Sequence, residues 1–186
     1  MSLLARVRAK FARPPEPVRA ALAGDADEQV LAWGERVDGG WTVATSRGLR
    51  VVPAGSGEAS APLAWHHIGT ARWGAAGEGG TFVITPLVEV EPGVQAREAP
   101  QRHVLRVAGG LPGVLRARVD RTVVTSKRHP LPTGGGVLLV ARRVPGQAAR
   151  EWTVVFDDDA DRDDPVARQV ARDRLAAAVD AEDPSR

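Results

Sequence analysis

His66 and His67 are the residues of this sequence whose types and spacing most directly suggest chemistry. They lie in the stretch "LAWHHIGTARWGAAGEGGTFVIT", residues 63–85, and imidazoles bind metal ions and transfer protons. A metal site would need two or three imidazoles to converge with a carboxylate. Neighbours on a strand point in opposite directions, and His103 and His129 lie far along the chain. We therefore predict that the pair forms a bend between strand segments, with a metal site as the alternative.

The run "DDDADRDDP" at residues 157–165 suggests calcium binding because it is dense in carboxylates. Counted from Asp157, acids occupy positions 1, 3 and 5 of a calcium loop. Arg162 then stands where the loop needs glycine, and Arg168 stands where it needs a bidentate glutamate. The sequence therefore predicts a solvated start to a helix, with weak adventitious cation binding as the alternative.

Other motifs of catalytic or nucleotide-binding proteins are incomplete. The segment "TGGGV" at 133–137 lacks a following Lys-Ser or Lys-Thr and leads into a strand, which indicates a hairpin turn. Ser46, Thr125 and Ser126 have neither a nucleophile elbow nor an identifiable base. We therefore predict no catalytic residue, cofactor site or metal site, and no enzymatic activity.

Composition and charge are those of an ordinary globular protein. The chain has 186 residues, of which 43% are hydrophobic and 26% are charged, a balance typical of a folded domain. Its formal net charge is only +2, so the sequence pI of 9.9 reflects the high pKa of arginine and not a strongly basic surface. Nucleic acid is therefore not an expected partner.

The absence of cysteine excludes disulfides, thiolate metal sites and a cysteine nucleophile, and it fits a reducing compartment. No apolar run approaches the roughly 18 residues that span a bilayer, and the first residues do not resemble a secretory signal. We expect a cytoplasmic protein, with the inner face of the membrane as an alternative location. The excess of arginine over lysine, with abundant Ala, Gly and Val, indicates GC-rich coding of the actinobacterial kind.

Residues 1–24 are predicted to form a basic, amphipathic helical extension. Apolar residues recur at helical spacing with basic residues between them, before two prolines end the run. Such a helix either packs on the core or docks to an anionic membrane or an acidic partner. The residues with which it would dock are Leu4, Arg6, Arg8, Lys10, Phe11 and Arg13.

Residues 25–180 are predicted to be a single α+β domain followed by a tail at 181–186. Short runs rich in Val, Thr and Trp, separated by glycine-containing turns, predict antiparallel meanders. Apolar residues at helical spacing predict the helices, and "EPGVQAREAPQ" is a connector. We expect about eight strands in bent sheets, with N-terminal, central and C-terminal helices. The expected segments are a meander at 30–90, a helix at 111–120, a meander at 122–158 and a helix at 164–180.

Three segments carry a resemblance to a known fold: "EQVLAWGERVDGGWTVATSRGLRVV", "APLAWHHIGTARW" and "TFVIT". Together they resemble the bacterial pleckstrin-homology-like pattern over residues 28–86. With "VARRVPG" and W-x-V-x-F-D near its end, the chain also resembles an uncharacterised actinobacterial family. The resemblance implies a strongly bent sheet capped by a helix, a partial barrel used as a binding scaffold without catalytic residues. The first hairpin holds Glu35, Arg36 and Asp38, which departs from the basic hairpin of the lipid-binding members.

Two further features suggest a binding surface. Five tryptophans lie in strand-like segments, where we expect most of them to fill the core and allow one or two to anchor a partner. A basic patch is predicted on two neighbouring strands, with an ordinary solvated face as the alternative. It would comprise Lys127, Arg128, Arg142 and Arg143.

These observations favour a non-enzymatic binding or scaffolding module that contacts another protein. The first alternative is a peripheral membrane adaptor, in which the basic amphipathic N-terminus meets an anionic membrane surface. The second is an enzyme whose site the motifs do not reveal. No cofactor is expected in the favoured interpretation.

Overall fold

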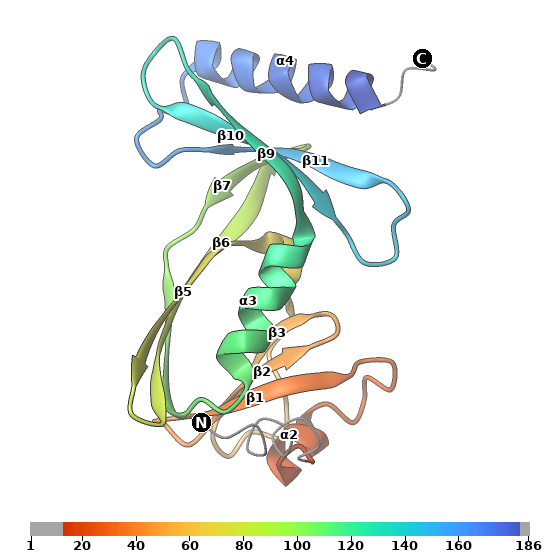
Figure 1. Ribbon diagram of the computed structural model, residues 1–186, viewed down its shortest axis with the longest axis vertical. Helices are drawn as coiled ribbons and strands as arrows, with labels where there is room; N and C mark the ends of the chain where they lie inside the picture. The colour runs from red at the N-terminus through yellow and green to blue at the C-terminus, as the bar shows by residue number, and fades with distance from the viewer. Residues whose placement is uncertain (1–12, 183–186) are drawn as a thin grey trace. The chain divides into compact units, whose positions relative to one another are not determined.

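The computed structural model describes residues 13–182 (Figure 1). Most of the predicted N-terminal docking helix, including Leu4, Arg6, Arg8, Lys10 and Phe11, lies outside the described residues, whereas Arg13 is exposed just before the first described helix. Contacts within the chain group into two compact units. Unit 1 contains the described residues up to Thr85 together with Pro100–Asp120, and unit 2 contains Pro86–Ala99 and the described residues from Arg121 onward.

Unit 1 is built on an antiparallel sheet. The strands follow the order β4-β3-β2-β1-β8-β6, with β5 paired on the other side of β6. Strand β6 gives its first part to this sheet, pairing Gly80–Ile84 with β8. The strands are β1 (Val30–Arg36), β2 (Trp41–Thr45), β3 (Gly48–Val52), β4 (Leu63–Ala64), β5 (Ile68–Ala76), β6 (Gly79–Glu91) and β8 (Gln101–Val107).

Two helices complete unit 1. Helix α2 (Glu16–Ala21) buries Val18 against Val43 and Val52 of the sheet. Helix α3 (Leu111–Thr122) begins in unit 1, and its Leu111 and Leu115 lie in the main core of this unit with the sheet residues. Burial of these leucines fixes α3 to the sheet, since an apolar helix face is stabilised chiefly by what it packs against.

The His66–His67 stretch is a corner, as its sequence predicts. Trp65, His66 and His67 form one turn of 3₁₀ helix, η1, between β4 and β5. Trp65 is 2% exposed, and its Nε1 donates a hydrogen bond to the Thr45 carbonyl at 3.1 Å. The bend is made by a 3₁₀ turn, and the buried indole N–H of Trp65 is satisfied by the Thr45 carbonyl.

A buried ion-pair cluster ties the loop before β1 to β3. Arg50 is 8% exposed and donates from Nε to Glu28 Oε1 at 3.0 Å. Its Nη2 donates to Asp25 Oδ2 at 2.8 Å, and its Nη1 donates to the Ser60 carbonyl at 3.0 Å. The guanidinium is therefore satisfied by two carboxylates and a carbonyl, which is the condition for burying a charge.

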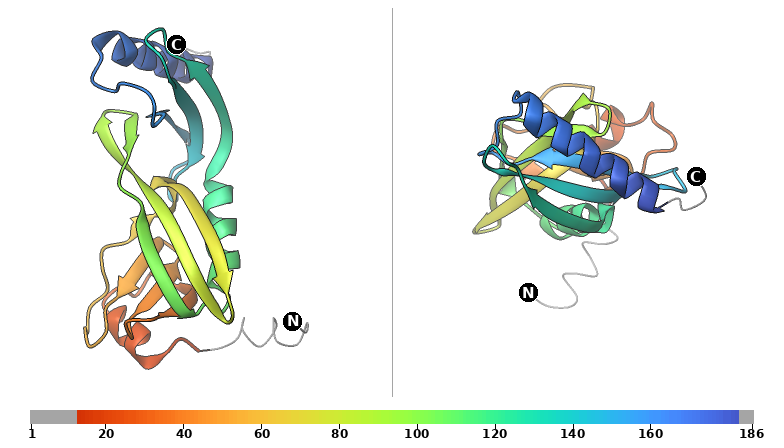
Figure 2. Two further views of the ribbon diagram at one scale, coloured as in Figure 1. Left: turned by 90° about the vertical axis from the view of Figure 1, so that its left-hand side faces the viewer. Right: turned by 90° about the horizontal axis from the view of Figure 1, so that it is seen from above.

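Unit 2 is a second sheet with one helix on it. Its strand order is β6-β7-β11-β10-β9; β7 and β11 are parallel, and the other pairs are antiparallel. Helix α4 runs across one face of this sheet (Figure 2). The elements are the second part of β6, β7 (Val94–Arg97), β9 (Val123–Pro130), β10 (Gly136–Arg143), β11 (Arg150–Phe156) and α4 (Pro165–Glu182).

Helix α4 packs through small residues. Ala167 and Ala171 are fully buried against the sheet, beside the partly buried Leu175. The spacing in the sequence predicts that Val166, Val170, Leu175 and Val179 form the apolar side of this helix, but Val166 and Val179 are 50% and 45% exposed. That part of the prediction is wrong because the face that meets the sheet is set by the closest approach of the backbones, which alanine permits.

The α+β class predicted from sequence is confirmed. Residues 13–182 contain eleven strands, where the sequence predicts about eight. One of the additional strands is β7, within the stretch expected to be a connector. It has only four residues and lies between β6, with which it pairs antiparallel, and β11, with which it pairs in parallel. The pairing with β11 has no local sequence signal. None of the helices in the described part of the chain is long and apolar enough to cross a membrane.

Candidate binding sites

The histidines do not converge on a metal. His66 and His67 touch edge to face, with ring centroids 4.3 Å apart, on the η1 turn. Across residues 13–182, no group of three or more His, Asp or Glu side chains is placed to hold a metal ion.

His103, on β8, is the most deeply buried of the four histidines. It is 5% exposed, and its Nδ1 lies 3.3 Å from Arg36 Nη1. Because a guanidinium can only donate, Nδ1 accepts and the proton sits on Nε2, which has no protein partner. Burial, reinforced by the Arg36 charge, lowers the pKa of His103. The Arg36 hydrogen bond and the Gly40 amide in turn lower the pKa of Asp38 to about 2.

Stability is expected to fall as the pH drops below the ordinary histidine value of about 6.5. Because the folded-state pKa of His103 is depressed, the unfolded chain binds the extra proton first, so acid favours unfolding through this window. Urea unfolding of the wild type and of His103→Gln at pH 7.5 and 5.5 measures the effect. The variant should lose less stability between the two pH values. Equal losses would show that His103 is not the group responsible.

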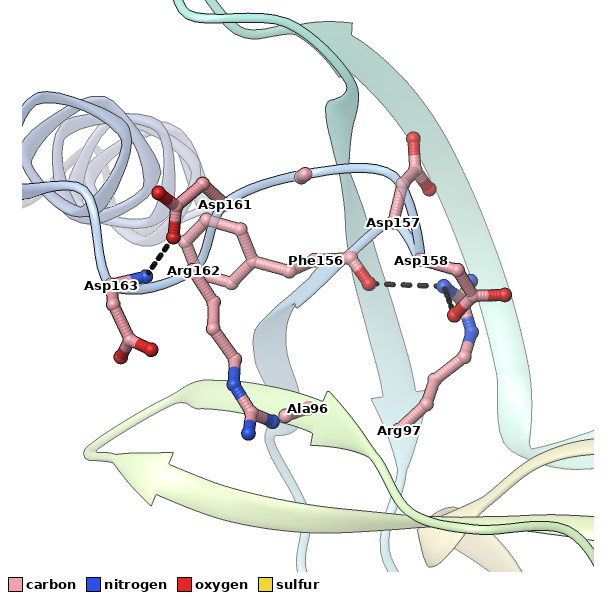
Figure 3. Close-up of a pocket in the computed structure, with 9 residues that line it drawn as sticks. Ala96, Arg97, Phe156, Asp157, Asp158, Asp161, Arg162 and Asp163 are labelled. Carbon is pink, nitrogen blue, oxygen red and sulfur yellow. Dashed lines mark hydrogen bonds and ion pairs between the residues drawn. The ribbon is translucent and has the colours of Figure 1, made fainter.

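The acidic run forms the connection between β11 and α4 and lines a pocket of about 370 Å³ in unit 2 (Figure 3). Arg97 Nη1 donates to the Phe156 carbonyl at 3.0 Å and to Asp158 Oδ1 at 3.1 Å. Asp161 Oδ1 accepts from the Asp163 amide at 2.9 Å. The full lining is Ala96, Arg97, Phe156, Asp157, Asp158, Ala160, Asp161, Arg162 and Asp163.

These carboxylates hold the connection in place. Asp157 Oδ2 accepts from Arg128 Nε at 2.6 Å. Asp164 Oδ1 accepts from the Val166 amide at 2.9 Å and so caps the start of α4. This arrangement agrees with the predicted solvated start of a helix, and it gives most of the acids a structural role.

The predicted basic patch is not assembled as expected. Arg142 is 5% exposed and donates from Nη1 to Thr122 Oγ1 at 3.0 Å, so it is not part of a surface. Arg128 is engaged by Asp157, as described above, while Lys127 and Arg143 are exposed. Alternation along β10 places Arg142 and Arg143 on opposite faces, which is why neighbours in sequence do not make one patch.

A second pocket, of about 500 Å³, lies in unit 1 between α3 and the β5 and β6 strands. We call it the aromatic pocket. Trp73 and Phe82 contact each other there, with ring centroids 4.4 Å apart. Phe82 is 2% exposed and Leu115 1%, so these two form the deep apolar part. The lining is Ala71, Trp73, Phe82, Pro112, Gly113, Leu115, Arg116 and Asp120.

Two glycines shape the aromatic pocket. Gly80 has φ +152°, and a Cβ there would lie 2.7 Å from the Trp73 ring, so only glycine lets the indole lie against β6. Gly113 is inside α3, where glycine is unfavourable by about 1 kcal/mol relative to alanine. A Cβ at Gly113 would meet nothing within 4 Å. No steric reason requires glycine at that position, and its missing side chain leaves the pocket open.

The pocket edge carries one ion pair, between Arg116 Nε and Asp120 Oδ2 at 3.6 Å. The side chains of Arg116 and Asp120 are 86% and 68% exposed. An exposed pair one helical turn apart contributes little to stability, so both groups are available to a ligand.

Of the five tryptophans, only Trp65 is fully buried; Trp33, Trp41, Trp73 and Trp152 are half-buried. The sequence allows one or two of the five tryptophans to anchor a partner, but it does not single out Trp73 or the other residues of the aromatic pocket. The one local signal was the unfavourable Gly113 in a predicted helix. The contact of Trp73 with Phe82 depends on strand pairing, which the sequence does not display.

No family model matches the chain, and neither a curated protein nor a solved structure matches it.

Proposed function

We propose that the chain is a non-enzymatic binding module whose aromatic pocket receives an apolar side chain of a partner protein. The observation that carries the proposal is the open pocket itself, with Trp73 and Phe82 in its lining and Gly113 beside it. Its volume lies in the range of sites that bury a ligand, and tryptophan is enriched where a few residues supply most of the binding energy.

We also propose a pleckstrin-homology-like scaffold for this module. The support is in unit 1: an antiparallel sheet with a register irregularity between Glu35 and Arg36, followed by α3 packed on it. A scaffold of this kind, acting in the cytoplasm, presents a pocket between its helix and its sheet without supplying catalytic groups.

Filling the pocket tests the proposal. Gly113→Leu places a side chain in open space beside the pocket, and it should also stabilise α3 by up to about 1 kcal/mol. Gly110→Leu is the matched control, because it too meets nothing within 4 Å and Gly110 does not line the pocket. Crosslinking and affinity capture from native cells should recover a reproducible partner with the wild type and the control. The Gly113→Leu chain should lose that partner while its melting temperature is retained or raised.

Two results would overturn this function. A partner retained fully by Gly113→Leu would show that the pocket is not where it binds. Flotation of the wild-type chain with phosphatidylserine vesicles, abolished by replacing Arg6, Arg8 and Lys10 with glutamine while no protein partner is found, would favour the membrane adaptor instead.

A further inference from the structure

We infer that the open edge of strand β9, in unit 2, binds an extended acidic segment of a partner protein, which adds one strand to the sheet. This surface is separate from the aromatic pocket of unit 1 and goes beyond the function proposed for that pocket. Three observations support it: the position of β9 in the sheet, the direction of its backbone groups and the charges beside it.

Strand β9 forms an edge of the unit 2 sheet. It pairs with β10 along one side, and no strand of the described residues pairs with its other side. The four consecutive residues from Thr125 to Arg128 are all exposed. Because neighbouring residues on a strand point to opposite faces, neither face of β9 is covered there. Such an edge is a template for pairing with another strand.

The backbone of β9 has donors and acceptors for the added strand. The Gly136 carbonyl accepts from the Asp157 amide at 2.9 Å, so even-numbered residues of β10 direct their backbone groups toward β11. The odd-numbered residues of β10 therefore hydrogen-bond to β9, whose own odd-numbered residues lie opposite them. Ser126 and Arg128 are left with N–H and C=O groups that point away from β10.

Positive charge lies beside this edge, on the face of the sheet that α4 covers. The register places Lys127 opposite Leu139, which packs in the same cluster as α4, so the Lys127 side chain lies on that face. Burial, together with the charges of Arg174 on α4 and of Lys127, lowers the pKa of His129. Both cations therefore lie close to β9, and both are exposed.

Neither Lys127 nor Arg174 has a carboxylate partner in residues 13–182, whereas Arg128 on the opposite face of β9 is held by Asp157. The acids that line the unit 2 pocket lie beside β7, which β11 and β10 separate from β9. The residues that share the side of α4 with Arg174 are uncharged: Val170, Ala177, Ala178 and Ala181. The face of α4 next to β9 therefore carries positive charge that no acid balances.

These charges determine which strand the edge accepts. Side chains directly opposite each other on antiparallel strands interact, and opposite charges stabilise the pair. A partner with carboxylates at alternate positions would place them beside Lys127 and toward Arg174. A second copy of β9 has no acid and, in the symmetric register centred on Lys127, would set two lysines opposite each other. The edge therefore favours an acidic strand over self-association.

Two peptides that differ only in charge test this inference: acetyl-Ser-Val-Glu-Val-Glu-Val-Ser-amide and its counterpart with lysine in place of glutamate. Each is titrated into the ¹⁵N-labelled full chain at low ionic strength, and hydrogen exchange of the Ser126 and Arg128 amides is followed. The glutamate peptide should bind several-fold more tightly and slow the exchange of both amides, because they become hydrogen-bonded. Methylating the central valine nitrogen removes a donor that faces β9 and should weaken binding about fivefold.

Variants of the chain separate the charge from the backbone. Lys127→Gln and Arg174→Gln should each weaken binding of the glutamate peptide about two- to threefold. Arg162→Gln is the charge-matched control, because Arg162 lines the unit 2 pocket beside β7, and it should leave the affinity unchanged. Ser126→Pro removes an outward N–H but no hydrogen bond to β10, so binding should fall while the melting temperature is largely retained.

Three results would overturn the inference. Equal affinities of the two peptides, unaffected by Lys127→Gln or Arg174→Gln, would show that charge does not select the strand. Unchanged exchange of the Ser126 and Arg128 amides at millimolar peptide would show that this edge is not a binding surface. Protection of the same amides that rises with the concentration of the chain alone would assign the edge to a second copy. Gly113→Leu should bind the glutamate peptide as the wild type does, so these results are independent of the function proposed for the aromatic pocket.

Discussion

Replacing Arg50 with methionine is expected to lower the free energy of unfolding by about 3–5 kcal/mol. Glu28, whose side chain is fully buried, would lose the guanidinium that donates to both of its oxygens. Arg47 Nη1 lies 3.9 Å from Glu28 Oε2, which is too far to donate a hydrogen bond in place of Arg50. The buried carboxylate therefore retains its desolvation penalty, and the methionine has no donor to satisfy it. Urea unfolding followed by circular dichroism at pH 7 measures the loss.

Arg47→Met is the matched control for this change. Arg47 reaches the same acids, with Nη1 3.2 Å from Asp25 Oδ1, but its side chain is 47% exposed. Because solvent screens such a pair, the expected loss is below about 1 kcal/mol. Similar losses of unfolding free energy in the two variants would mean that burial does not distinguish the two arginines. The Arg50 cluster would then not stabilise the link between β3 and the loop before β1.

The second large effect is expected at the corner that His66 and His67 occupy. Trp65→Ala should destabilise the chain by about 3–5 kcal/mol, because it empties a buried site next to Leu49 and Ile68 and removes the donor to the Thr45 carbonyl. The midpoint of unfolding in urea should fall accordingly.

Two companion variants sharpen this test. Trp65→Phe keeps most of the apolar volume but loses the Nε1 hydrogen bond, so it should fall between the wild type and the alanine variant. His67→Ala changes a half-buried neighbour on the same turn and should alter stability by less than about 1 kcal/mol. If His67→Ala matched Trp65→Ala, the corner would depend on the imidazole and the structural interpretation of the pair would be wrong.

The acidic run whose composition suggests calcium binding has a structural role in the connection between β11 and α4. Asp164 caps α4, and Asp157 and Asp158 engage Arg128 and Arg97. The binding site is instead proposed where apolar rings are left accessible. A module that binds by packing apolar side chains does not require clustered acids and bases.

Local patterns in the sequence were sufficient for the class of fold and for most elements. The Val, Thr and Trp runs predict strands that the structure places at Val30–Arg36, Trp41–Thr45 and Gly48–Val52, because period-two alternation and glycine turns are local properties. Helix α3 spans Leu111–Thr122 where its spacing predicts 111–120, and α4 spans Pro165–Glu182 where 164–180 is expected.

Contacts between distant segments determined the strand pairing, the burial of Arg142 and the formation of the aromatic pocket. Strand β7 pairs with its chain neighbour β6 and also in parallel with β11, where Val94 lies opposite Val154 and Gln95 opposite Val155. No local pattern shows the second of these partners. The burial of Arg142 follows from which face of β10 it occupies, and the sequence alone does not say which face is covered. The aromatic pocket likewise requires Trp73, Phe82 and Leu115 to be brought together by the sheet and α3. The periodicity of side chains is a local property of the sequence. Burial of a residue and its proximity to others depend on how distant segments pair, and only the tertiary structure determines both.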